Sequence, residues 1–136
     1  MTPDDLLWRR ARLSIEATPP GVRVELPKGG TELELFRQKP WSIGRFANAD
    51  VRVLLDDAEA LQRLFRNGWG GRTTCLIRFD SKDAWVLEHL GHGGVILQNG
   101  LQLWASNGYA KLANGDRIEP SAGLVFRFWE AYERVV

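Results

Sequence analysis

The chain has 136 residues, of which 44% are hydrophobic and 26% are charged, and its formal net charge is +1 at pH 7. This length favours one domain, and this composition is ordinary for a globular fold. A net charge near zero offers no overall attraction to nucleic acid or anionic lipid, and no apolar run approaches the roughly 18 residues of a spanning helix. We therefore expect a protein partner, with no nucleic acid and no membrane insertion.

Cysteine content and the first residues indicate the compartment. Cys75 is the only cysteine, so no intrachain disulfide and no cysteine-rich zinc site can form. Asp4 and Asp5 stand where a secretory signal carries basic residues, and no continuous apolar segment follows them. These features predict a cytoplasmic location, and we expect no cofactor and no metal.

The first twenty residues are predicted to form a lead-in helix and a linker. Thr2 can cap a helix, Pro3 suits a first helical position, and the two Asp residues that follow complement the positive end of the helix dipole. We expect this helix to run from Pro3 to Arg12. A breaker cluster at residues 17–21 then separates it from the main domain, which we place at residues 21–130, with a tail at 131–136.

From Gly21 onward the hydrophobic period changes to two. Val22, Val24 and Leu26 alternate with charged residues, and residues 33–35 do the same after the turn at 28–30. This pattern predicts a hairpin with one solvent-facing side. Further strands are predicted at residues 75–79, 84–87, 95–98, 101–104 and 124–129. Many short strands separated by turn residues favour an all-β fold, a β-sandwich.

One segment interrupts the strands. Residues 56–66 contain good helix formers, begin with Asp56, and place Leu61, Leu64 and Phe65 at helical spacing. We expect a short helical insertion here, ended by Asn67-Gly68.

Four motifs occur in a characteristic order along the chain. Ile43-Gly44-Arg45 is followed by Asn48-Ala49-Asp50-Val51, then by Gln98-Asn99-Gly100, and then by the segment from Leu112 to Ile118 with Gly115-Asp116 at its centre. This order resembles that of forkhead-associated (FHA) domains, which are β-sandwiches whose loops at one end recognise phosphothreonine peptides. The resemblance implies that Arg45 contacts the bound peptide, and a guanidinium suits phosphate because it presents a rigid fork of donors. It implies structural roles for Gly44, Asn48, Asp50, Asn99, Gly100, Gly115 and Asp116.

The chain departs from the family pattern where the family binds its ligand. The family's Ser-Arg-x-His segment falls on residues 71–74, so Gly71 replaces the Ser and Thr74 replaces the His. The family's loop Asn falls on Gly94. Losing two donors to a charged group can weaken binding by a factor of roughly a hundred. The resemblance therefore implies a divergent member with altered or phosphate-independent recognition. Its candidate binding residues are Arg45, Asn67, Gly70, Gly71, Arg72, Thr73, His92, Gly93 and Gly94.

Three other functions stay open. The first keeps phosphothreonine dependence and places the protein in serine/threonine kinase signalling. The second, which the resemblance also implies, is a scaffold component of a bacterial secretion assembly, and it predicts self-association. The third is a small hydrolase that uses His89 or His92. No serine lies in a nucleophile-elbow context, and neither His has a nearby Asp or Cys in the sequence to complete a metal site, so we expect neither catalysis nor a metal.

Overall fold

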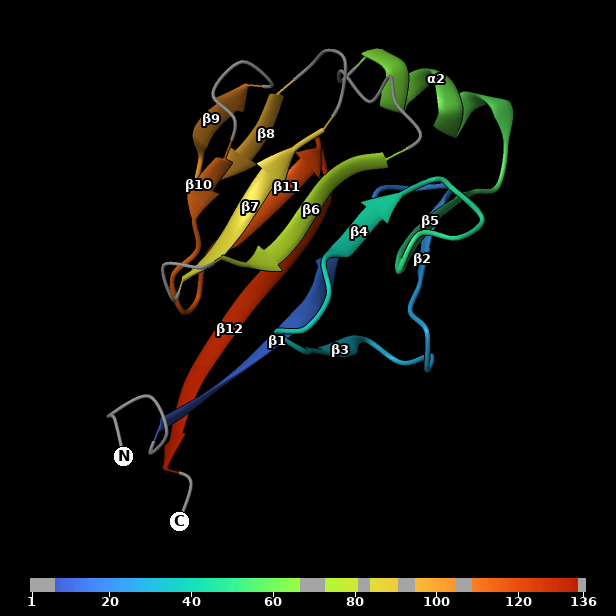
Figure 1. Cartoon of the computed structure of the whole chain (residues 1–136). Helices are drawn as coiled ribbons and strands as arrows, with labels where there is room; N and C mark the ends of the chain where they lie inside the picture. Colours follow the sequence, from blue (N-terminus) through green and yellow to red (C-terminus); the bar gives the residue numbers. More distant parts are fainter. Residues whose placement is uncertain (1–6, 67–72, 81–83, 91–94, 105–108, 135–136) are drawn as a thin grey trace.

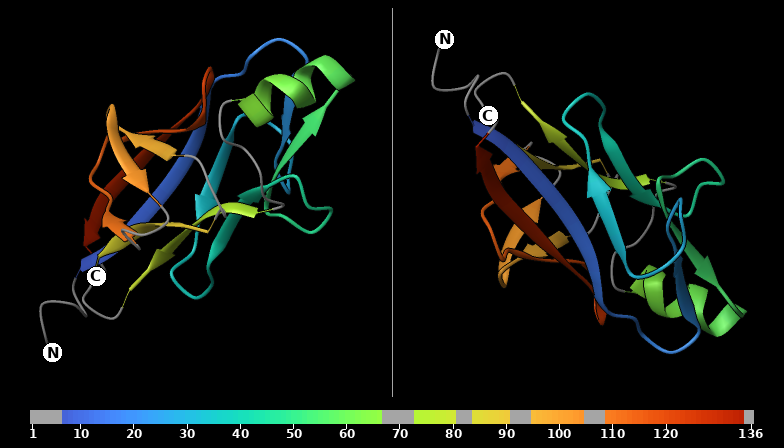
Figure 2. Two further views of the ribbon diagram at one scale, coloured as in Figure 1. Left: turned by 90° about the horizontal axis from the view of Figure 1, so that it is seen from above. Right: turned by 90° about the horizontal axis from the view of Figure 1, so that it is seen from below.

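The computed structural model describes residues 7–66, 73–80, 84–90, 95–104 and 109–134. Within these residues, two six-stranded sheets stack as layers (Figures 1 and 2). The first sheet has the order β3-β1-β12-β11-β8-β9, with β3 at Glu32–Leu35, β1 at Leu7–Ala17, β12 at Leu124–Arg134, β11 at Arg117–Ser121, β8 at Val95–Gln98 and β9 at Leu101–Trp104. The second has the order β10-β7-β6-β4-β5-β2, with β10 at Tyr109–Lys111, β7 at Trp85–His89, β6 at Thr73–Phe79, β4 at Trp41–Gly44, β5 at Val51–Leu55 and β2 at Val22–Glu25.

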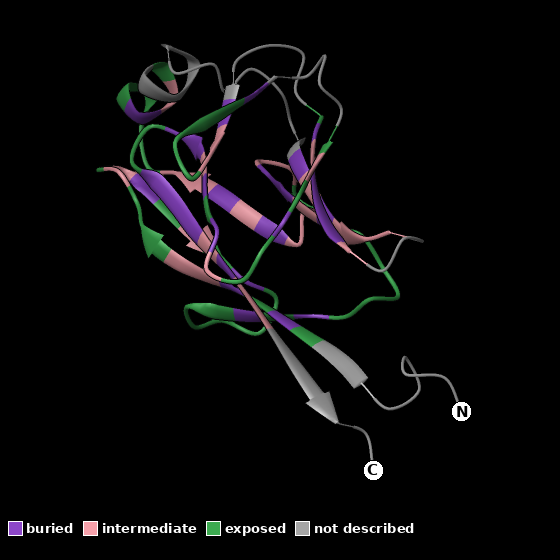
Figure 3. Cartoon of the chain, turned by 90° about the vertical axis from the view of Figure 1, so that its left-hand side faces the viewer, coloured by how far each residue is buried: buried purple, intermediate pink, exposed green. Residues whose placement is uncertain are grey.

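The core lies between the two sheets. Alternate residues of the strands point inward, as Val51 and Val53 do on β5, where both are at most 2% exposed while Arg52 between them is half-buried. The largest fully buried side chains include Trp85 and Phe128, whose rings are 6.1 Å apart between centroids. Figure 3 shows buried and more exposed residues alternating along the strands. The predicted all-β sandwich is confirmed.

The N-terminal prediction is wrong for the residues that the structure describes. Residues 7–17 form β1, which pairs with β12 from Leu7↔Arg134 to Ala17↔Val125 and also pairs with β3. Residues 2–6, which carry the helix-start signals, lie outside the described part of the chain. From Leu7 the long-range pairing prevails over these local signals, and the predicted helix to Arg12 is replaced by a strand. The boundary at residue 21 and the tail from 131 are corrected with it, because β1 lies inside a sheet and β12 continues to Arg134.

The hairpin predicted over residues 22–35 is also wrong, although both of its strands exist. β2 pairs with β5 in one sheet, whereas β3 pairs with β1 in the other. Gly29 and Gly30, each with φ +73°, turn the chain from one layer to the other. Alternation identifies a strand with one buried face, but it carries no information about which strand lies beside it.

The predicted helix at 56–66 and the predicted later strands are confirmed. α2 spans Ala58–Arg66, and the carboxylate of Asp57 accepts a 2.8 Å hydrogen bond from the backbone N–H of Ala60, which caps the first turn. The predicted stop at Asn67-Gly68 lies outside the described residues. Figure 1 shows α2 at one end of the sandwich, beyond the end of β5. No helix in the described part of the chain is long and apolar enough to cross a membrane.

Candidate functional site

Arg45 lies at one end of the sheet, where several strands begin or end. It follows β4 directly, and Gly44, the last residue of β4, has Arg52 of β5 and Thr73 of β6 as its register partners. β6 runs antiparallel to β4, so β6 begins where β4 ends. The structure thus brings two predicted site residues, Arg45 and Thr73, to the same end of the sheet although they are far apart in sequence.

β7 ends at the same end of the sheet. Its last residue, His89, has Cys75 of β6 as its register partner, and β6 and β7 are neighbours in the sheet. This end of the sheet comprises the end of β4, the start of β6 and the end of β7, and we call it the Arg45 end (Figure 1). The remaining predicted binding residues lie outside the described residues, in segments that adjoin the described chain at Arg66, Thr73 and Leu90: Asn67, Gly70, Gly71, Arg72, His92, Gly93 and Gly94.

The side chain of Arg45 is half-buried. Its Nε atom is shielded from solvent, although the residue as a whole keeps contact with water. Asn48, in the loop that follows, is exposed. Part of the Arg45 side chain therefore belongs to the rim of the sandwich.

Asp50 closes the loop that begins at Arg45. Its carboxylate Oδ2 accepts hydrogen bonds from the backbone N–H of Ser42 at 2.9 Å and from the Ser42 hydroxyl at 3.2 Å. The Asp50 N–H donates to the Ser42 Oγ at 3.0 Å, and Oδ1 forms an ion pair with Lys39. Within the loop, the Ala49 N–H donates to the Phe46 C=O at 3.1 Å. Both ends of the loop are therefore held against β4, by Gly44 through the chain and by Asp50 through Ser42.

Sequence reasoning missed Ser42 and Lys39. Ser42 lies eight residues before Asp50, and the two meet because β4 and β5 run parallel, with Ile43 opposite Val51. The Ile43-Gly44-Arg45 motif adjoins Ser42, but nothing in the spacing of the sequence indicates a hydrogen bond between Ser42 and Asp50.

The other predicted structural residues lie at the opposite end of the sandwich. Asn99 and Gly100 have φ values of 53° and 81° and connect β8 to β9, as expected for an Asn-Gly hairpin turn. Asp116 is 9% exposed, and its carboxylate accepts hydrogen bonds of 2.8–2.9 Å from the Gln98 and Asn99 side chains and from the Ala113 N–H. Because the Leu112 N–H binds the C=O of Trp85, the first residue of β7, this network lies far from His89. It joins two turns and stabilises the fold.

The described histidine and cysteine side chains, His89 and Cys75, are buried. His89 is 6% exposed. Burial raises the pKa of the Cys75 thiol to about 12, so this thiol is protonated at neutral pH. His92 lies outside the described residues. Among those that are described, no group of three or more His, Cys, Asp or Glu residues is placed to hold a metal ion.

Comparison with known proteins identifies the fold. No family model matches the chain, and no curated protein matches it in sequence. Among solved structures, the kinase-interacting FHA domain of the Arabidopsis kinase-associated protein phosphatase KAPP is similar with a TM-score of 0.62 and 18% identity, over 92% of this chain and 96% of that one. The FHA domain of Chlamydia trachomatis CT664 gives 0.59 and 16% identity over 88% and 96%, and FHA-1 of Mycobacterium tuberculosis Rv1747 gives 0.55 and 16% over 89% and 97%. The chain has the fold of a forkhead-associated domain.

Proposed function

We propose that this chain is a non-catalytic, cytoplasmic interaction module that binds a segment of another protein at the Arg45 end, and that phosphothreonine is not required for this binding. The observation that carries the proposal is the register of β4, β6 and β7, because it places Arg45, Thr73 and His89 together at the Arg45 end. Loops held by a rigid sheet are a common place for binding residues. Among the structural neighbours, the domain of KAPP is described as kinase-interacting.

Altered recognition follows from the side chains that the chain carries in these segments. Gly71 and Gly94 stand where the family resemblance places a Ser hydroxyl and an Asn amide, and glycine offers no side-chain donor. A hydrogen bond to a charged group is worth about 1.5–3 kcal/mol, so phosphate contributes less to affinity without the Ser hydroxyl, and the missing Asn amide removes a contact to the peptide backbone. Arg45 retains a cation whose guanidinium binds backbone carbonyls and carboxylates as well as phosphates.

The test is a pair of synthetic peptide libraries that are identical except that the central residue is threonine in one and phosphothreonine in the other. Binding is measured by fluorescence anisotropy with the native chain, with Arg45→Ala and with Arg37→Ala. Arg37 is a matched control, because its exposed guanidinium stacks over Phe79 at the far end of β6 with 5.1 Å to the ring centroid.

We expect the strongest peptides to bind equally well in both forms, Arg45→Ala to weaken them about tenfold or more, and Arg37→Ala to leave them unchanged. Peptides that bind only when phosphorylated would overturn phosphate independence and support the signalling alternative. Equal affinities for Arg45→Ala and native protein would place the binding surface elsewhere.

A further inference from the structure

β2 leaves part of its backbone without hydrogen-bond partners. It lies at the end of its sheet, and β5 is its only strand neighbour among the described residues. The Asp56 N–H donates to the Gly21 C=O at 2.8 Å. This bond fixes which alternate residues direct their backbone groups toward β5, namely Gly21, Arg23 and Glu25. Val22, Val24 and Leu26 therefore turn their N–H and C=O groups away from β5.

Two of these outward groups are used within the chain. The Val22 N–H donates to the Pro19 C=O at 3.2 Å, and the Leu26 C=O accepts from the Gly29 N–H at 3.0 Å. The Val22 C=O, both groups of Val24 and the Leu26 N–H have no partner in the part of the chain that the structure describes. An edge of this kind is a template for a further strand.

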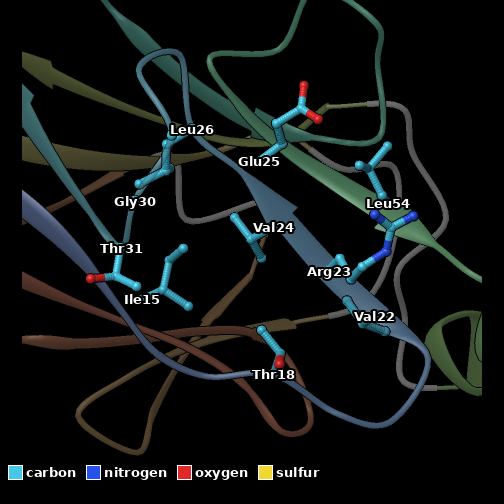
Figure 4. A pocket seen from close by; sticks show the side chains of 11 residues that line it. Ile15, Thr18, Val22, Arg23, Val24, Glu25, Leu26, Gly30, Thr31 and Leu54 are labelled. Atoms are coloured by element: carbon cyan, nitrogen blue, oxygen red, sulfur yellow. The ribbon is translucent and has the colours of Figure 1, made fainter.

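A groove of about 430 Å³ runs along this free edge. Figure 4 shows it between β2 and the end of β1, with Val24 and Ile15 among the labelled residues. Its lining includes residues from both faces of β2, with Val22 and Val24 from the inner face and Arg23 and Glu25 from the outer one. An added strand would therefore find apolar side chains inside and charged ones outside.

The charge pattern of β2 is complementary to that of a second copy of β2 placed antiparallel to it. In Val22-Arg23-Val24-Glu25-Leu26, a cation and an anion stand on either side of a central valine. When two copies are placed antiparallel about Val24, Arg23 lies opposite Glu25 of the other copy, and the same pairing recurs on the other side of the axis. Opposite charges facing each other across strands stabilise a sheet, and like charges destabilise it.

We propose that β2 is a self-association surface that pairs antiparallel with β2 of a second copy of this chain, centred on Val24. The Val24 N–H of each copy donates to the Val24 C=O of the other, and each Leu26 N–H donates to the Val22 C=O of the other. This register uses the four backbone groups that lack partners. The contact is isologous, so it closes as a dimer and does not continue into a filament.

The exposure of the charged pair permits this contact. Arg23 has 67% of its side chain exposed and bonds Asp56 through Nε at 2.7 Å, so its terminal nitrogens can reach a second carboxylate. Glu25 is exposed. The pairing is short, so we expect a dimer that dissociates on dilution. It uses a different surface from the Arg45 end and does not depend on what binds there.

The test uses two single variants, alone and mixed. Arg23→Glu gives an edge with two acidic residues and Glu25→Arg an edge with two basic residues, so each homodimer has like charges opposite each other. Mixing the variants in equal amounts restores an opposite charge at every pair. Sedimentation velocity over a concentration series measures the mass, which is 15.4 kDa for the monomer.

We expect the native chain to dimerise, each variant alone to dimerise at least about tenfold more weakly, and the mixture to recover the native affinity. Mixing cannot cure a folding defect, so recovery separates a lost contact from a damaged fold. A native chain that remains monomeric at all concentrations, or single variants that dimerise as well as the native chain, would overturn the proposal.

A backbone variant provides an independent arm. Val24→Pro removes an N–H that faces away from β5, so the β2–β5 ladder keeps its bonds while the new contact loses its central donor. Val24→Thr keeps this N–H and the β-branched shape. We expect Val24→Pro to abolish the dimer and Val24→Thr to retain it. Equal dimerisation of the two variants, with unchanged melting temperatures, would contradict the backbone register.

Discussion

Replacing Asp50 by alanine removes the residue that closes the Arg45 loop onto β4. The half-buried Asp50 carboxylate accepts two hydrogen bonds from Ser42 and pairs with Lys39. Hydrogen bonds to a charged group contribute about 1.5–3 kcal/mol each, and a partly exposed ion pair such as that of Lys39 contributes under about 1 kcal/mol. Because the two bonds share one serine, we expect the free energy of unfolding to fall by about 2–4 kcal/mol.

Urea denaturation followed by tryptophan fluorescence measures this change. Ser42→Ala serves as the control, because it removes the hydroxyl contacts and keeps the bond from the backbone N–H to the carboxylate. We expect Ser42→Ala to cost about 1 kcal/mol and the double-mutant cycle to give a coupling energy of about 1 kcal/mol. A loss below about 0.5 kcal/mol for Asp50→Ala is typical of an unconstrained surface residue and would refute the anchoring role.

Three further predictions concern the buried Cys75 thiol, the Asp116 hydrogen-bond network and two turn glycines. Burial raises the pKa of Cys75 from 9.0 to about 12, so the free energy of unfolding should fall as the pH rises above about 9, where the unfolded chain loses a proton that the native chain keeps. Denaturation of Cys75→Ala should show less of this fall, and an identical pH dependence would contradict the assignment. Asp116→Ala leaves three donors without their acceptor and should cost about 3 kcal/mol or more in the same denaturation assay, so a loss under about 1 kcal/mol argues against the network. Gly100→Ala should cost about 1 kcal/mol, because φ is +81° but nothing lies within 4 Å of the added Cβ. Gly123→Ala should cost more, because its φ is +84° and its Cβ would lie 3.3 Å from that of Pro19, and the reverse order of the two melting temperatures would contradict this reasoning.

Local patterns predicted those elements that local chemistry determines. Asn99-Gly100 predicted a hairpin between 95–98 and 101–104, and Asn99 takes the positive φ that such a turn requires. The helix at 56–66 was predictable because its cap, its spacing and its helix formers lie within one segment. Each of these elements forms from residues that are near one another in the sequence.

The errors occur in segments whose structure depends on pairing with a strand from a distant part of the chain. Leu7 to Ala17 becomes a strand because β12, more than a hundred residues later, lies beside it. Ala11 and Leu13 alternate with arginines at a period of two, yet the cap signals before them favoured a helix. The hairpin over 22–35 failed because each of its strands has a partner from another part of the chain.

The candidate site was predicted in the same partial way. The Ile43-Gly44-Arg45 motif predicted a binding role for this end of the sheet, and the register of Gly44 with Thr73 brings the ends of β4 and β6 together there. The half-burial of Arg45 and the contact between Ser42 and Asp50 were not predictable, because both depend on how neighbouring strands are aligned.

The most direct test of the proposed function is the affinity of one peptide measured four ways: in its threonine and phosphothreonine forms, against the native chain and against Arg45→Ala. The proposal predicts equal affinities of the two forms for the native chain and a loss of about tenfold or more with Arg45→Ala at an unchanged fold. A peptide that binds only in its phosphorylated form, or one that binds Arg45→Ala as tightly as the native chain, would contradict it.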